Sequence, residues 1–430
     1  MKKILLFLAL LPSASFLQAE AWSLDSCINY AIEHNISVKT SNLEKYSAEL
    51  SVTEAKDAFL PQAQAEISQS FNIGRGLTAE NTYANRNTSQ TGWNVGVSLP
   101  LFQGLSATRR LTYSRAYLKA VAEQYEASKD NVELQVIAQY LQVLYCGEVL
   151  DVARERERLA VVQQQRTAVL VSEGKVPELE LTQADAQVAQ DHLSVVNAEN
   201  DRVLALLDLS QLLQLPSMEG FDIQTLANST DSYLTSNEVF TAALQSNHSL
   251  RAGRLEIEAA DKNIDLAKTG YIPRLSFNAG VGSSYYHIGG MSNAPFHRQM
   301  RDNFNTYFGF SLSVPLFDAF STRNSVRRAE LAKNQAILRY DDARSNLYKA
   351  INQAAQQSLA ARSRHEAAVV AENATKAALE AMDVKYEFGR ANATELEQAR
   401  SEYIQARLAT VQAKYETILR ERILAFYNRP

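Results

Sequence analysis

Residues 31–61 read AIEHNISVKTSNLEKYSAELSVTEAKDAFLP, and residues 243–273 read ALQSNHSLRAGRLEIEAADKNIDLAKTGYIP. The two stretches align without a gap, and nine of the 31 positions hold the same residue, far more than unrelated segments would share. The identical pairs are Ala31/Ala243, Asn35/Asn247, Ser37/Ser249, Leu43/Leu255, Glu44/Glu256, Ala48/Ala260, Ala55/Ala267, Lys56/Lys268 and Pro61/Pro273. Such a repeat indicates that the fold is built from two copies of one structural unit.

Later motifs repeat in the same order. VSLPLFQG at residues 97–104 corresponds to SLSVPLFDA at residues 311–319, and Gly174 corresponds to Gly389. We therefore predict two structural repeats, which are residues 22–225 and residues 226–430.

The first residues have the form of a secretory signal. Two lysines precede an apolar run at residues 4–11, and residues 19–21 read AEA, the small-x-small form of a signal-peptidase site. We predict that residues 1–21 are a signal peptide and that the mature chain begins at Trp22. An uncleaved anchor is the alternative, but the apolar run is too short to span a bilayer.

The composition excludes several classes of function. The net charge of -5 gives no basic surface for nucleic acid. Cys27 and Cys146 are too few for a disulfide framework, and no cysteine or histidine pair has the spacing of a metal site. The chain also lacks a phosphate-binding loop and a nucleophile motif. We expect no enzyme activity, no metal and no cofactor.

The distribution of proline and glycine predicts long helices. Residues 101–176 contain no proline, and residues 316–429 contain none and a single glycine, Gly389. Each stretch is rich in strong helix formers. We predict a very long helix in each, the first from about residue 108 to 172, then a turn at Gly174 or Gly389 and a second helix that returns.

The returning helices carry apolar or small residues at alternating steps of four and three. The first series is Ala189, Leu193, Val196, Val203 and Leu207, and the second is Ile404, Leu408, Val411, Tyr415 and Ile418. This period of 3.5 residues is typical of a coiled coil, whose narrow apolar seam leaves most of each helix polar. An ordinary amphipathic helix in a globular bundle is the alternative.

Four stretches alternate strictly between apolar and polar residues, which predicts strands. They lie at about residues 62–73, 92–102, 274–286 and 305–316. Each is long enough to cross an outer membrane when tilted, and Trp93, Phe71, Phe308 and Tyr307 are candidates for aromatic girdles. Four strands cannot close a barrel, and lipid excludes an open sheet edge, so other copies of the chain must complete it. A soluble sandwich sheet is the alternative.

The order of these elements, found twice, resembles the TolC-like outer-membrane efflux channel family. The phrases WSLDSCINYAIEHN, AFLPQ/GYIPR and SLPLFQG/SVPLFDA carry the resemblance, which covers the mature chain. It implies a mainly α fold with a β-barrel part. In a homotrimer, four strands per chain form a 12-stranded barrel in outer-membrane lipid, and twelve helical arms form a long periplasmic tunnel. It further implies the exit duct of a tripartite efflux system, with a periplasmic adaptor protein and an inner-membrane pump as partners.

The resemblance also implies roles for residues at the two helical turns. The adaptor would dock on Gly174, Lys175, Val176, Gly389, Arg390 and Ala391. A constriction of the closed tunnel would involve Glu180, Glu395, Tyr386, Gln183 and Gln398, with Glu180 as the partner of Tyr386. Ala391 stands where the family's best-known member has a basic residue, and a second acidic position is Gln398 or Gln183. Glu395 also fits a helix cap equally well, since residues 392–395 read NATE.

Other functions remain open at this point. The same kind of pore serves as the exit channel of a type I protein secretion system. A periplasmic coiled-coil adaptor or a structural envelope protein belongs to a different class, but neither needs two symmetric pairs of amphipathic strands.

Overall fold

The computed structural model describes residues 21–77, 82–85, 87–226 and 236–429. The predicted signal peptide, residues 1–21, lies outside the described residues except for Ala21. The chain divides into two compact units, and each sequence repeat contributes to both. Unit 1 comprises Met1–Asn42, Tyr125–Asn247 and Arg344–Pro430, and unit 2 comprises Leu43–Gln124 and His248–Ala343.

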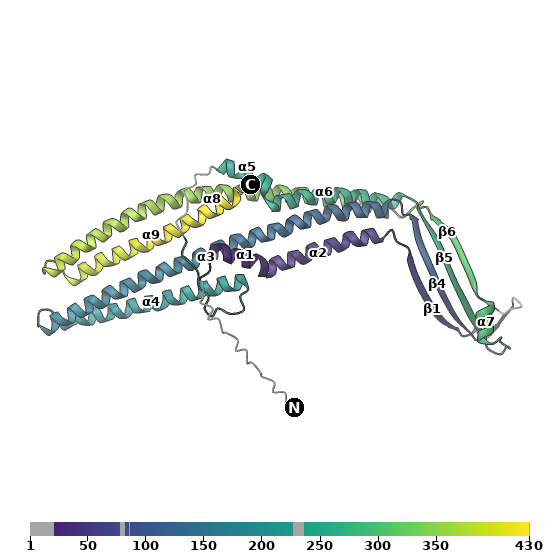
Figure 1. The fold of residues 1–430 in the computed structure, drawn as a ribbon, viewed down its shortest axis with the longest axis horizontal. Coiled ribbons are helices and arrows are strands. Elements are labelled where there is room, and N and C mark those ends of the chain that lie inside the picture. Colours follow the sequence, from purple (N-terminus) through teal and green to yellow (C-terminus); the bar gives the residue numbers. More distant parts are fainter. Residues whose placement is uncertain (1–20, 78–81, 86, 227–235, 430) are drawn as a thin grey trace, which may run out of the picture. The chain divides into compact units, whose positions relative to one another are not determined.

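The elements follow one another as labelled in Figure 1. The described helices are α1 (Leu24–His34), α2 (Ile36–Asp57), α3 (Ser106–Ser172), α4 (Glu178–Leu213), α5 (Ser236–Ser246), α6 (His248–Lys268), α7 (Phe296–Asp302), α8 (Ser321–Glu387) and α9 (Ala393–Tyr427), with a 3-10 turn at Thr269–Tyr271. The described strands are β1 (Gln62–Asn72), β2 (Arg75–Leu77), β3 (Tyr83–Asn85), β4 (Thr88–Phe102), β5 (Arg274–Ile288) and β6 (Asn305–Ser313). Helices α3 and α8 have 67 residues each, so the very long helices that the sequence predicts are confirmed.

The residues shared by the repeats have the same structural role in both. The backbone N–H of Asn35 donates to the carbonyl of Ala31 at 2.8 Å, and Asn247 donates to Ala243 at 3.0 Å. Ala31 and Ala243 are 0% and 1% exposed. In each repeat an asparagine therefore closes one helix directly before the next, over a buried alanine.

The core of unit 1 lies along α3, against which α1, α4 and α9 pack. Tyr140 of α3 is 1% exposed, and its hydroxyl lies 2.6 Å from the carbonyl oxygen of Gln224 and 3.0 Å from that of Trp22. Among the described helices, α3 alone contains an 18-residue window apolar enough to cross a membrane by composition. Of that window, 44% is buried inside the protein.

The two predicted seams differ in burial. In α9, Ile404, Val411 and Tyr415 are 2%, 7% and 9% exposed and belong to the core of unit 1. In α4, Leu193 and Val203 are both 52% exposed, although Val195 and Leu209 of the same helix are buried. One seam is therefore packed within the chain, and the other is left without a partner in it.

Unit 2 contains a four-stranded antiparallel sheet in the order β1-β4-β5-β6. Strand β4 begins at Thr88, earlier than the predicted residue 92, because residues 88–91 pair with Tyr285–Ile288 of β5. Strand β6 ends at Ser313, short of the predicted residue 316, which agrees with the missing backbone N–H of Pro315. The segments that connect β1 to β4 and β5 to β6 contain the β2–β3 pair and helix α7, respectively.

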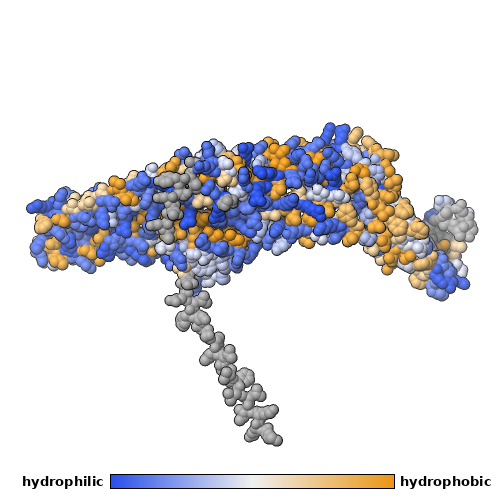
Figure 2. Space-filling model, turned by 45° about the horizontal axis from the view of Figure 1, so that its top comes forward, coloured by the Kyte–Doolittle hydropathy of each residue, from blue (hydrophilic) through white to orange (hydrophobic). Residues whose placement is uncertain are grey.

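The sheet has one apolar and one polar face, as the alternation predicts. On the apolar face, Ile67, Phe308 and Phe310 are 82%, 78% and 70% exposed. Figure 2 shows hydrophobic residues gathered over the strands. A soluble protein rarely exposes such a patch, whereas lipid covers it in a membrane barrel.

Candidate functional site

Helices α3 and α4 form one helical hairpin and α8 and α9 form a second, and the two hairpins have the same kind of turn. Gly174 and Gly389 have φ of +69° and +68°, in the left-handed region that glycine enters without steric cost. Lys175 N–H donates to the Leu170 carbonyl at 2.9 Å, and Arg390 N–H donates to the Lys385 carbonyl at 2.8 Å. No atom lies within 4 Å of a Cβ built on either glycine, so backbone conformation requires the glycines.

The residues predicted to dock an adaptor lie at these two turns. Gly174, Lys175, Gly389 and Arg390 are exposed, whereas Val176 and Ala391 are partly buried. The Lys175 ammonium pairs with Glu173 at 2.6 Å. Phe388 next to the second turn is 74% exposed, an apolar side chain that the sequence prediction did not include.

A cavity of about 270 Å³ lies between α3, α4 and α9, close to the turns. Its walls include Glu180 and Gln183, two of the residues predicted for the constriction. Glu395 and Gln398 do not line it. The Glu395 carboxylate accepts from the Asn392 N–H at 2.9 Å, and the Glu395 N–H donates to Asn392 Oδ1 at 2.8 Å, so the capping-box alternative is realised in the structure.

Within the chain, Tyr386 connects the two hairpins through a residue that the sequence analysis did not name. Its hydroxyl accepts from Gln163 Nε2 of α3 at 3.0 Å, and Arg166 pairs with Glu387 beside it at 3.2 Å. Glu180, the expected partner, lies on α4 and lines the same cavity as Gln163. Gln163 takes its place because α3 is the helix that reaches α8 here.

Charged side chains that the sequence analysis missed lie in the wall of the cavity and next to it. Arg156 of α3 pairs with Asp191 of α4 at 2.8 Å, and Arg400 pairs with Glu397 within α9 at 3.4 Å. The side chains of Asp191 and Arg400 are 1% and 6% exposed. A signal was available for Glu397, which lies seven residues before Ile404 and so continues the seam of α9.

Burial raises the pKa of the Glu397 carboxyl above its ordinary value. The negative charge of Asp191 acts in the same direction, while Arg400 and Arg156 oppose it. Asp191 Oδ2 and Arg400 Nε have no hydrogen-bond partner. The four groups thus form a strained polar cluster between the hairpins.

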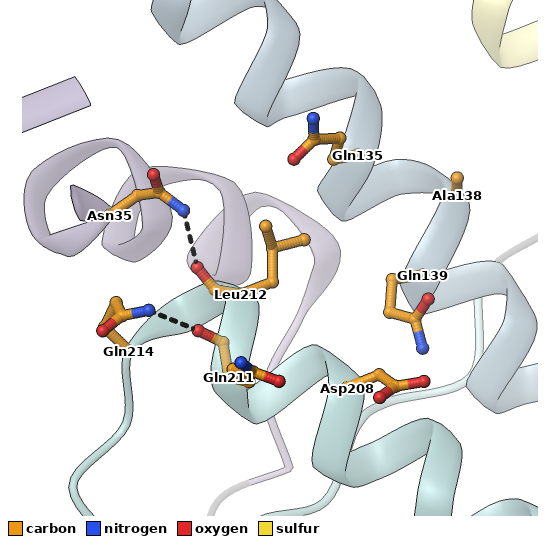
Figure 3. Close-up of a pocket in the computed structure, with 8 residues that line it drawn as sticks. All are labelled: Asn35, Gln135, Ala138, Gln139, Asp208, Gln211, Leu212 and Gln214. Atoms are coloured by element: carbon orange, nitrogen blue, oxygen red, sulfur yellow. Dashed lines mark hydrogen bonds between the residues drawn. The ribbon is translucent and has the colours of Figure 1, made fainter. Parts of the chain in front are cut away.

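A second cavity, of about 540 Å³, lies where the α1–α2 break meets α3 and the end of α4 (Figure 3). Its side chains are mostly amides, and Asp208 is its one acid. Asn35 Nδ2 donates to the Leu212 carbonyl and Gln214 Nε2 to the Gln211 carbonyl, at 3.0 and 2.8 Å. Within the described residues no three His, Cys, Asp or Glu side chains are placed to hold a metal ion.

An amphipathic four-stranded sheet with open edges and two long helical hairpins define a channel-forming protein of the outer membrane. A model of the family described as outer membrane efflux protein matches residues 27–214 and 239–427. The chain belongs to this family, which confirms the resemblance found in the sequence. It is an outer-membrane exit duct for efflux.

Known proteins of similar sequence match almost the whole chain. The chain is 25% identical to the outer membrane protein TolC of Vibrio cholerae over 97% of this chain and 93% of the relative. It is 23% identical to TolC of Escherichia coli over 97% and 84%. Its fold is similar to the Campylobacter jejuni CmeC outer membrane channel, with a TM-score of 0.77 at 18% identity over 94% of this chain and 85% of that chain.

Proposed function

We propose that this chain forms a homotrimer that conducts small molecules from a periplasmic adaptor and an inner-membrane pump through the outer membrane. The open edges of the sheet carry this proposal. Strands β1 and β6 each pair on one side only, and backbone groups without partners are excluded from lipid. Three copies of a four-stranded sheet give the twelve strands that the family resemblance implies.

The hairpin turns are the proposed docking surface for the adaptor. They are exposed, they carry a cation each (Lys175 and Arg390), and Phe388 adds an apolar anchor. Exposed aromatic side chains next to basic ones are favoured at protein interfaces. Transport energy would come from the pump.

The contacts between the hairpins support a constriction in the resting duct. The Tyr386–Gln163 hydrogen bond and the Arg166–Glu387 ion pair both join α3 to α8. Three copies of Glu180, and of Glu395 after its cap is released, would bring carboxylates together around the tunnel axis and attract cations. This role for the two glutamates rests on their position at the turns.

Conductance of the detergent-purified protein in planar bilayers, measured beside its oligomer mass, tests the proposal. A trimer with small, cation-selective conductance is expected. Replacing Glu180 and Glu395 with glutamine should weaken block by multivalent cations. A monomer without conductance would refute the assembly, and unchanged block would refute the role of the two glutamates alone.

A further inference from the structure

Two glycines and a tyrosine lie in one row on the polar face of the sheet. Gly96 of β4 is opposite Gly280 of β5, which is opposite Tyr307 of β6. A Cβ on Gly280 would lie 2.7 Å from the Tyr307 hydroxyl oxygen and 2.8 Å from its Cζ, and a Cβ on Gly96 would lie 3.3 Å from the hydroxyl. The ring therefore lies flat across β5, in a trough that exists because both positions lack side chains.

The flat ring leaves one of its faces open. Asn94 Nδ2 of β4 lies 3.5 Å from the Tyr307 hydroxyl, and Tyr307 remains 45% exposed. Its position differs from the aromatic girdle that the sequence suggested for it, because girdle residues project from the lipid face. Tyr307 instead presents an aromatic surface to the polar side of the sheet.

A single carboxylate lies on the same polar face of the sheet. Glu66 is the only acidic residue in β1, β4, β5 and β6, it is exposed, and it is opposite Asn94 in the register. The only lysine or arginine in these strands is Arg274 of β5. Glu66, Asn94 and Gly282 lie opposite one another in neighbouring strands, and Arg274 is eight residues along β5 from Gly282. That separation is about 26 Å at 3.3 Å per residue. It exceeds the Debye length of about 8 Å, so the charge of Glu66 is not balanced within the strands.

We propose that Glu66 and Tyr307 form a contact site for organic cations on the inner wall of the barrel. The carboxylate attracts the cation, and the open face of the phenol ring contacts its apolar surface as well as its charge. The inference rests on the proposed trimer, which turns the polar face toward the lumen and places three copies of each residue there. Weak contacts of this kind suit a duct, because a solute must leave as readily as it enters.

The glycine trough gives the site its geometry. Without it, the phenol ring would project into the lumen and narrow the passage. A methyl group at position 280 would overlap the ring and would also lie 2.8 Å from the backbone carbonyl oxygen of Val95, so both the flat ring and the β4–β5 pairing require glycine there.

Binding of choline to the purified trimer tests the site, with the neutral isostere 3,3-dimethylbutan-1-ol as the matched probe. Saturation-transfer difference NMR with irradiation of aromatic protons detects methyl groups that lie against a ring, and a maltoside detergent adds no choline or aromatic signal. Glu66→Gln and Tyr307→Leu should each weaken choline binding about two- to fivefold. Tyr307→Phe, which keeps the ring, and Ser311→Ala, on the same face of β6, should bind choline like the unmodified protein.

The two proposals fail in distinguishable ways. If the unmodified protein is trimeric and neither Glu66→Gln nor Tyr307→Leu changes choline binding, the cation site is refuted while the duct stands. If the isostere weakens in parallel with choline, the contact is apolar and the site is equally refuted. If the unmodified protein is not a trimer, the assembly itself is refuted by its mass, whatever the probes do.

Discussion

The ion pair between Arg156 and Asp191 should respond unequally to loss of its two members. The Asp191 side chain is 1% exposed, whereas that of Arg156 is 28% exposed. The Arg156→Gln variant leaves a buried carboxylate with only Gln187 Nε2 as a hydrogen-bond donor, at 2.9 Å. Breaking a buried pair in this way costs about 3–5 kcal/mol of unfolding free energy.

The converse variant should be milder. In Asp191→Asn, the remaining guanidinium can turn toward water because part of its side chain is already exposed, so the loss should be about 1–3 kcal/mol. An Arg156→Met/Asp191→Leu double variant removes both charges and should be closer to the unmodified protein than Arg156→Gln is.

Thermal denaturation of the detergent-purified protein, followed by far-ultraviolet circular dichroism, measures this order. The apparent midpoint should be lowest for Arg156→Gln, intermediate for Asp191→Asn and highest for the double variant. If Asp191→Asn unfolds at the same temperature as Arg156→Gln or below it, the unequal exposure of the two side chains does not control the energetics, and the reasoning is wrong.

Three further predictions concern the same hairpins and the strand–helix junction. Because the folded pKa of Glu397 is raised, the stability that its protonated form contributes is present below the ordinary value of 4.5 and is lost as pH rises through the folded pKa. The change in melting temperature caused by Glu397→Gln should therefore be more favourable at pH 7 than at pH 4.5, and an equal change at both would contradict this. Tyr386→Phe removes one hydrogen bond between the hairpins, worth about 0.5–1.5 kcal/mol, and should raise the open fraction in single-channel recordings; unchanged recordings would count against the constriction. Gly104 and Ala319 occupy matching turns with φ of +62° and +52°. Ala319→Gly should relieve about 1 kcal/mol of backbone strain and raise the melting temperature. Gly104→Ala should lower the melting temperature, because the new Cβ would lie 3.0 Å from Ile272. Shifts of the same sign in the two variants would refute this prediction.

The local pattern of the sequence was sufficient for the main elements of the fold. Period-two alternation identifies the four long strands, and the long stretches without proline identify α3 and α8. The first residue of β4 could not be predicted from the sequence, because Thr88, Ser89 and Gln90 do not alternate with apolar residues. They are extended because they pair with β5. Tertiary pairing, and not local propensity, decides such ends.

The candidate site was predictable in its backbone and not in its contacts. The turns at Gly174 and Gly389 were predictable because they require a left-handed backbone conformation, which glycine adopts without steric cost. The partner of Tyr386 depends instead on how two helices far apart in sequence are rotated against each other, which no single segment encodes. The same holds for Asp191, whose burial against Arg156 follows from the pairing of α3 with α4.

The unequal burial of the two seams follows from the duplication. Within one chain, the seam of α9 packs against α3, its neighbour from the first repeat. By the same duplication, α4 carries a seam like that of α9, and α8 carries a surface like that of α3. On α8, Leu359 and Val370 are 58% and 69% exposed, so neither this surface nor the seam of α4 is covered within the described chain. A head-to-tail contact between copies would satisfy both surfaces, and such a contact closes into a ring when its rotation allows. The contact that holds the two repeats together inside one molecule would then be the same kind of contact that joins one molecule to the next, which agrees with the assembly proposed from the open edges of the sheet.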